Sequence, residues 1–205
     1  MKVLLVNGSY HEKGCTYTAL AEVAKALNAN GVETEIYWLG QNQVSGCKGC
    51  WACKKVKKCV IDDGVNEFVA KAAEFDGFVF GSPVYYASAN ATLIALLDRL
   101  FYSTAFPKTM KVGFAVTVAR RGGASATFDE LNKYFTISGM PVVSGQYWNS
   151  VHGMTPGEAI SDEEGMQNMR TLARNCAFLI KSIRLGRERY GLPEVEVRKR
   201  TNFIR

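Results

Sequence analysis

The sequence predicts an α/β domain built on a five-stranded parallel sheet with helices on both faces. Short apolar segments alternate along the chain with longer segments whose apolar residues recur at helical spacing. Most apolar segments end at a glycine or a polar loop, which is typical of a buried strand that leads into a helix. This alternation favours parallel pairing, because each crossover helix returns the chain to the same end of the sheet. The composition agrees, since 205 residues with 47% apolar content suffice for one sizeable core.

In the first half of the chain, glycine and proline mark where the elements end. The first apolar strand breaks at Gly8, and the helix after it stops at Asn30-Gly31. Pro83 removes a backbone donor and indicates a loop after the third strand. The expected strands cover residues 3–7, 33–39 and 76–81. One helix is expected to end at residue 30, and two more are expected at residues 65–75 and 89–102.

The second half continues the same order. Two further strands are expected at residues 111–118 and 141–147, separated by a helix that ends near Ser138-Gly139. A polar loop through Trp148, His152 and Pro156 then leads to residues 161–164, which match a helix capping box. The final long helix has an apolar face that includes Met166, Met169, Leu172, Ala173, Cys176, Leu179, Ile180 and Ile183.

Three loops follow the first, third and fourth expected strands, at residues 9–18, 82–88 and 120–125. The carboxyl ends of parallel strands meet at one edge of a sheet, so these loops should lie together. Ligands of open α/β sheets bind at this edge, near the point where the strand order reverses. The sequence therefore predicts a ligand site formed by the three loops.

The first of these loops has the features of a phosphate site. It leads into a helix N-terminus, where free N–H groups and the positive end of the helix dipole favour an anion. Ser9, Thr16 and Thr18 add hydroxyls that donate hydrogen bonds without adding charge. The loop matches neither the dinucleotide fingerprint nor the Walker pattern. A hydroxyl-rich loop here is what a flavodoxin-like fold uses for flavin mononucleotide (FMN); an ordinary βα loop is the alternative.

The second loop offers flat apolar surfaces and backbone polar groups, which an isoalloxazine ring requires. A surface turn at a subunit contact is the alternative. The residues 81–86, Gly-Ser-Pro-Val-Tyr-Tyr, and the later Leu97-Asp98-Arg99 resemble the signature of the NADPH-dependent FMN reductase family. The resemblance extends from the first strand to about the fifth. It implies a flavodoxin-like fold and non-covalently bound FMN.

The resemblance also implies which residues contact FMN. In the family, a glycine-rich loop lies beside the flavin's pyrimidine edge. This loop corresponds to residues 120–123, of which Arg121 and Gly122 are the better candidates for a contact with the ring. In the phosphate loop, Tyr10, His11 and Cys15 replace the family's proline, arginine and asparagine. A helix N-terminus would lower the pKa of Cys15. The expected FMN-binding residues are Ser9, Cys15, Thr16, Tyr17, Thr18, Pro83, Val84, Tyr85, Tyr86, Arg121 and Gly122.

Four of the six cysteines lie in a cysteine-rich loop at residues 44–62, as Cys47-x2-Cys50-x2-Cys53-x5-Cys59. Closely spaced thiolates on an irregular loop suit an iron–sulfur cluster. A structural zinc ion and a loop without metal are the alternatives. The spacing resembles the iron–sulfur flavoprotein branch of the same family, which carries a [4Fe–4S] cluster beside FMN. Five nearby lysines would offset the cluster's negative charge and favour an acidic protein electron donor: Lys48, Lys54, Lys55, Lys57 and Lys58.

The basic charge is uneven. The net charge is +6, and residues 184–205 hold seven basic and three acidic residues, which supply four of these charges. We therefore expect a domain at residues 1–186 and a basic tail at 187–205. No nucleic-acid motif, signal peptide or membrane-length apolar segment is evident. We expect a cytoplasmic protein without nucleic-acid or membrane partners, and the family resemblance implies a homodimer or homotetramer.

Together these features predict an FMN-dependent oxidoreductase. No serine–histidine–aspartate set or pair of carboxylates indicates a catalytic side chain, so FMN is expected to carry the chemistry. As the resemblance implies, NAD(P)H or a small electron carrier would deliver electrons. A quinone, flavin, oxygen or partner protein would accept them. The alternatives are an electron carrier without its own substrate and a metal or redox sensor that uses the cysteine-rich loop.

Overall fold

The computed structural model describes residues 1–103, 106–197, 199, 201 and 203. Within these residues, a parallel sheet has the strand order β2-β1-β3-β5-β6. The order reverses beside β1, which places a switch point between β1 and β3. The strands are β1 (Lys2–Asn7), β2 (Glu33–Trp38), β3 (Gly77–Tyr85), β5 (Val112–Ala119) and β6 (Ser150–His152), with the short β4 (Ser88–Ala89) antiparallel to β3. The fold is the α/β flavodoxin-like fold that the sequence predicts.

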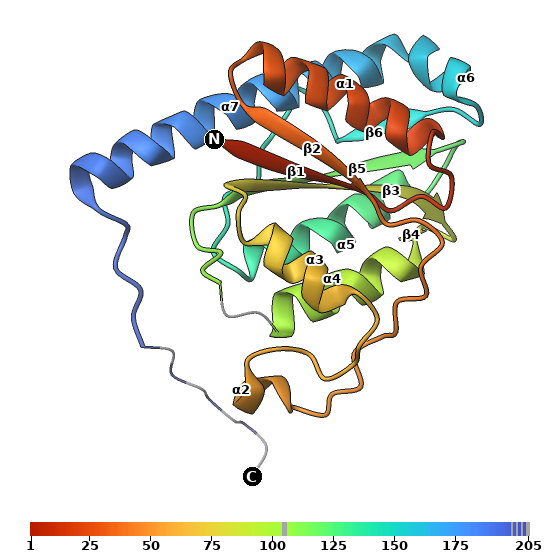
Figure 1. Cartoon of the computed structure of the whole chain (residues 1–205). Coiled ribbons are helices and arrows are strands. Elements are labelled where there is room, and N and C mark those ends of the chain that lie inside the picture. The colour runs from red at the N-terminus through yellow and green to blue at the C-terminus, as the bar shows by residue number, and fades with distance from the viewer. Residues whose placement is uncertain (104–105, 198, 200, 202, 204–205) are drawn as a thin grey trace.

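Helices cover both faces of this sheet (Figure 1). One face packs against α1 (Cys15–Ala29) and α7 (Glu163–Tyr190), and the other packs against α3 (Val65–Ala72), α4 (Ala91–Ser103) and α5 (Ala124–Thr136). Residues of β1 alternate between the two cores, because successive side chains of a strand point to opposite faces. Val3 and Leu5 join the first core, whereas Leu4 and Val6 join the second.

The third strand is longer than the sequence predicts. It continues through Pro83 to Tyr85 and then turns back into β4. Tyr86 and Ala87 form the turn with φ of 51° and 59°, a left-handed pair that suits a two-residue hairpin. Pro83 is still paired with Val118 of β5, but pairing with β1 ends at Gly81, so one side of the strand is an edge at this residue, where proline is tolerated.

The strand predicted at residues 141–147 is wrong. This segment forms a single bridge, between Val142 and Gly113, and regular pairing resumes only at β6. The buried side chain of Asn168 on α7 takes the place of a neighbouring strand. It accepts from the backbone N–H groups of Gln146 and Tyr147, and donates to the carbonyls of Tyr147 and Trp148.

Differences also occur around α6 (Pro156–Ser161), which lies where the sequence predicts a polar loop. Thr155 caps it by accepting from the Glu158 N–H. The capping box predicted at residues 161–164 is wrong: the cap of α7 is Asp162, which accepts from the Gly165 N–H at 3.0 Å, and glycine at this position has no side chain to complete a box.

Helix α7 continues to Tyr190, past the boundary expected at residue 186, and residues 191–197 extend beyond it as irregular chain (Figure 1). Of the basic residues that the sequence places in the tail, Arg198, Arg200 and Arg205 lie outside the described residues. No helix in the described part of the chain is long and apolar enough to cross a membrane.

Candidate functional site

A cleft of about 940 Å³ lies at the carboxyl edge of the sheet. This volume falls in the range of pockets that enclose cofactors. The residues that line the cleft come from the loop after β1, the end of β2, the β3 hairpin, the end of β5 and the segment after β6: Ser9, Tyr10, His11, Glu12, Lys13, Gly14, Cys15, Thr16, Trp38, Gln41, Pro83, Val84, Tyr85, Val118, Arg120, Gly153, Met154 and Pro156.

Buried polar side chains hold the loop after β1 in shape. The side chain of Asn7 accepts from the Ser9 N–H at 3.0 Å and donates to the Glu12 carbonyl at 3.0 Å. The Ser9 hydroxyl oxygen accepts from the His11 N–H at 3.1 Å, which leaves the hydroxyl proton to donate elsewhere. The indole of Trp38 donates to the Ser9 carbonyl at 2.9 Å. The loop is therefore arranged before any ligand arrives.

Gly8 sets the distance between this loop and β3. Its N–H donates to the Gly81 carbonyl at 2.9 Å, and a Cβ at position 8 would lie 2.9 Å from the same oxygen. Only glycine fits without moving one of the two backbones. This close approach brings the first loop beside the β3 hairpin.

The first turn of α1 opens toward the cleft. Within the described residues, no side chain caps this turn, whose N-cap is Gly14. The first amides of a helix have no intrahelical acceptor, so they present donors and a positive dipole end to the cleft. Cys15 and Thr16 line the cleft at this point, and Thr16 and Ser9 are buried. Donors at a helix N-terminus suit a phosphate group, and Lys13 offsets the negative charge of Glu12 among the residues that line the cleft.

The β3 hairpin forms the opposite wall. The carboxylate of Glu130 accepts from the Ser88 hydroxyl and from the Ala89 N–H at 2.8 Å, and this fixes the returning strand. A Cβ at Gly123, which has φ of 91°, would lie 2.8 Å from the Ala87 Cα, so the loop after β5 packs directly on the hairpin. Pro83, Val84 and Tyr85 consequently face the cleft.

The structure gathers six of the residues expected to bind FMN: Ser9, Cys15, Thr16, Pro83, Val84 and Tyr85. The other five do not line the cleft in the described structure. Tyr17 lies under the Lys13 ammonium at 4.0 Å, and the Thr18 hydroxyl donates to the Gly14 carbonyl at 3.2 Å. Tyr86, Arg121 and Gly122 are exposed at the loop tips. Their assignment stays a prediction.

Sequence reasoning missed several lining residues, notably Trp38, Arg120 and Met154. Trp38 and Arg120 each lie at or next to a strand's carboxyl end, so their position along the chain was a usable signal. The expectation for Cys15 also needs correction. Burial raises the pKa of the Cys15 thiol, and this outweighs the effect of the helix N-terminus. The Cys15 thiol is therefore protonated near neutral pH.

The cysteine-rich loop forms a second, smaller site beside the C-terminal end of α4. It contains the one-turn helix α2 (Cys53–Val56). Cys47, Cys50, Cys53 and Cys59 all line one cavity of about 20 Å³, together with Trp51, Ile61, Arg99 and Tyr102 among others. Among the residues that the structure describes, no three cysteine, histidine or carboxylate side chains are close enough to hold a metal ion. The four thiols thus share a cavity, and the loop would have to tighten for all four to bind one group.

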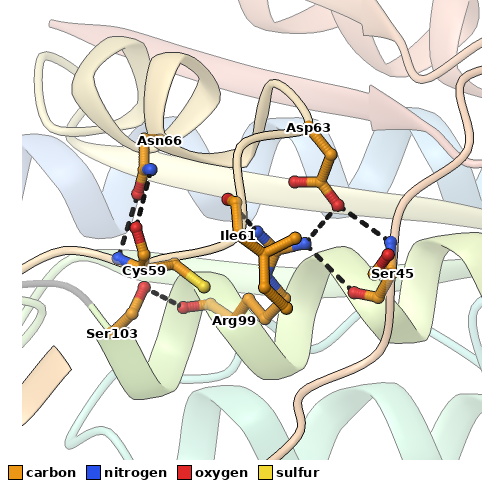
Figure 2. Close-up of polar contacts among 7 residues, drawn as sticks. All are labelled: Ser45, Cys59, Ile61, Asp63, Asn66, Arg99 and Ser103. Atoms are coloured by element: carbon orange, nitrogen blue, oxygen red, sulfur yellow. Dashed lines mark hydrogen bonds and ion pairs between the residues drawn. The ribbon is translucent and has the colours of Figure 1, made fainter. Parts of the chain in front are cut away.

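Arg99, which lines this cavity, forms an ion pair with Asp63 (Figure 2). Nη1 of Arg99 lies 2.6 Å from the Asp63 carboxylate, and the Arg99 side chain is 1% exposed. Burial alone would lower the pKa of Arg99, but hydrogen bonds to Asp63 and Cys59 raise it. The Arg99 hydrogen bond in turn lowers the pKa of Asp63. Both groups therefore stay charged. Four thiols with a buried cation beside them suit an anionic metal cluster.

Comparisons with known proteins identify relatives that match most of the chain. The family model for NADPH-dependent FMN reductase matches residues 1–155. An iron–sulfur flavoprotein from Methanocaldococcus jannaschii is 34% identical over 192 residues, which cover 90% of this chain and all of the relative. One from Methanosarcina thermophila is 30% identical over 193 residues, covering 92% and 100% of the two chains.

Solved structures share the fold at low sequence identity. RosB, crystallised with 8-demethyl-8-formylriboflavin-5'-phosphate, has a TM-score of 0.70 at 15% identity and covers 100% of this chain and 94% of its own. An NAD(P)H:quinone oxidoreductase from Methanothermobacter marburgensis has a TM-score of 0.63 at 16% identity, with coverage of 85% and 98%. An archaeal flavodoxin has a TM-score of 0.60 at 14% identity, with coverage of 88% and 99%.

Proposed function

The chain belongs to the NADPH-dependent FMN reductase family, and on that premise we propose that it binds FMN in the carboxyl-edge cleft and works as an oxidoreductase. The observation that carries this proposal is the pairing of an uncapped α1 N-terminus with two buried hydroxyls, Ser9 and Thr16, opposite the apolar wall from Pro83 to Tyr85. One half of the cleft suits a phosphate and the other suits a flat ring.

When bound, FMN supplies the redox chemistry, because a flavin can accept electrons singly or in pairs. The chain's own residues position it. The amides at the start of α1 and the hydroxyls of Ser9 and Thr16 would bind the phosphate. Pro83, Val84 and Tyr85 would contact the ring, and Arg120 at the end of β5 offers a cation at the cleft. Positive charge near a flavin ring favours its reduced, more negative form.

We further propose that Cys47, Cys50, Cys53 and Cys59 hold an iron–sulfur cluster. The two relatives described above are named iron–sulfur flavoproteins, and the four thiols of this chain line one cavity. These cysteines would hold a group that supplies one-electron transfer, and the residues of the cleft would hold a flavin that supplies both one-electron and two-electron chemistry. NAD(P)H or a small electron carrier is the proposed donor, and a quinone, flavin, oxygen or protein is the proposed acceptor.

The proposal is tested on protein purified without oxygen in the presence of FMN. We expect a flavin spectrum with one FMN per chain, a broad additional absorbance, and iron and sulfide in the assay. Mixing with NADPH in a stopped-flow instrument should bleach the flavin. A flavin that stays oxidised until a reduced carrier protein is added would indicate an electron carrier. Protein that never takes up FMN would refute the proposal, and iron without FMN would indicate a metal or redox sensor.

A further inference from the structure

Both ends of the cysteine-rich loop are attached to the same buried arginine. Nη1 of Arg99 donates to the Ser45 carbonyl at 3.1 Å and to the Asp63 carboxylate at 2.6 Å, while Nη2 donates to the Ile61 carbonyl at 2.9 Å. The same Asp63 oxygen accepts from the Ser45 N–H at 2.9 Å, which joins the two ends directly. One guanidinium on α4 therefore closes a loop of irregular backbone (Figure 2).

Cys59 is the cysteine that this network holds most closely. The side-chain amide of Asn66 on α3 pairs with its backbone, accepting from the Cys59 N–H at 3.1 Å and donating to its carbonyl at 2.9 Å. The Cys59 thiol and Arg99 line the same cavity, and Cys59 is one of the groups that raise the pKa of Arg99. The backbone of Cys59 is thus oriented, and its thiol lies near the guanidinium. Cys47 and Cys50, by contrast, are exposed.

The network also contains two buried polar atoms that are not satisfied. Nε of Arg99 and Oδ1 of Asp63 have no hydrogen-bond partner among the described residues. Buried polar atoms are nearly always paired, so an unpaired donor on a side chain that lines the cysteine cavity indicates a missing acceptor. Cluster and thiolate sulfurs are acceptors of the required kind, since hydrogen bonds to sulfur are a main determinant of cluster potential.

We propose that Arg99 is the positioning residue of the cluster site: it fastens both ends of the cysteine-rich loop and places a permanent buried positive charge beside the four thiols. This inference rests on the proposed cluster. It has two separable consequences. A fastened loop loses less conformational freedom when it binds the cluster, so loading is favoured. A nearby cation stabilises the additional negative charge after one-electron reduction, so the potential is raised.

The first consequence is tested on metal-free, FMN-loaded protein. Trypsin cleaves after lysine, and the cysteine-rich loop carries five exposed lysines. We expect Arg99→Gln and Asn66→Ala to be cleaved within residues 45–63 at least tenfold faster than the wild type, as measured by mass spectrometry. Unchanged FMN content shows that each variant is folded. Equal cleavage rates would refute the fastening of the loop.

The second consequence is tested by anaerobic loading with iron and sulfide, followed by a redox titration with dithionite as the electron donor. Arg99→Gln should lower both the iron per chain and the potential of the loaded fraction. Arg99→Lys keeps the charge but loses the planar fork of donors, so its iron content should fall while its potential stays near the wild-type value. Lys55→Gln removes an exposed charge of the same loop and is the matched control.

A purely structural role would lower iron content without moving the potential of the loaded fraction. If Arg99→Gln matches the wild type in both measurements, the inference fails and the cluster proposal stands. If the wild type takes up no iron, the cluster proposal fails and the role of Arg99 with it, while the FMN measurements still decide the flavin proposal.

Discussion

The flavin cleft and the cysteine-rich loop lie on the same chain, but different parts of the structure position them. The cleft is built from short segments at strand ends, and the hydrogen bonds of the sheet hold those ends. The backbone contact that brings two of its walls together is the hydrogen bond from the Gly8 N–H to the Gly81 carbonyl. The cysteine-rich loop lacks such a frame. Its ends, at Ser45 and Asp63, meet through side chains, and Arg99 supplies most of those contacts.

This difference predicts how each site responds to mutation. In the cleft, many weak contacts each contribute to FMN binding, so each substitution should weaken binding slightly and leave the fold intact. In the cysteine-rich loop, a single buried ion pair carries the arrangement, so its loss should affect stability as well as metal binding.

The largest effect is expected from Arg99→Met, which leaves the carboxylate of Asp63 partly buried without its cation. Breaking a buried pair by removing one partner typically costs about 3 kcal/mol or more. Arg170→Ala is the matched control, because Arg170 pairs with Glu22 at 2.7 Å while 40% of its side chain is exposed. An exposed pair contributes about 0–1 kcal/mol. Equal losses in urea unfolding would contradict the contrast.

Acid should weaken the same pair. The Arg99 hydrogen bond lowers the pKa of Asp63 below its ordinary value of 3.8. A lowered carboxyl pKa contributes stability that is complete above that ordinary value and is lost as pH falls through the lower, folded-state pKa. We therefore expect the wild type to lose more unfolding free energy between pH 6 and pH 3 than Asp63→Asn, which cannot titrate. Parallel pH curves for the two proteins would show that the pair is not coupled to folding.

In the cleft, Ser9→Ala and Thr16→Ala should each weaken FMN binding by about tenfold, since a hydrogen bond to a charged group contributes about 1.5 kcal/mol. Unfolding free energy should change little in comparison with Arg99→Met. Thr136→Ala is the control, because its hydroxyl donates to the Lys133 carbonyl at the end of α5, away from the cleft. Isothermal titration calorimetry measures the Kd. An unchanged Kd in both cleft variants would place the phosphate elsewhere.

The sequence predicted what depends on local pattern. Strand ends, glycines and hydroxyl-rich loops are local signals, and they identified the fold and six lining residues of the cleft. Contacts between distant segments could not be predicted in this way. Asn168 on α7 bonds the backbone of residues 146–148 in place of a neighbouring strand. Nothing in the sequence near residue 147 indicates this contact. The motif at residues 97–99 was visible, but the partner of Arg99 lies 36 residues away.

The smallest effect is expected at Trp38, which lines the cleft and donates from its indole to the Ser9 carbonyl at 2.9 Å. Trp38→Phe keeps an aromatic ring but loses this neutral hydrogen bond, which contributes about 1 kcal/mol. FMN binding should therefore weaken by only about fivefold, less than in Ser9→Ala. The quenching of tryptophan fluorescence by FMN should also diminish, whereas Trp148→Phe, outside the cleft lining, should preserve both the affinity and most of the quenching. A Trp38→Phe variant that binds FMN worse than Ser9→Ala would mean that one side chain dominates the cleft as well, and the contrast between the two sites would be lost.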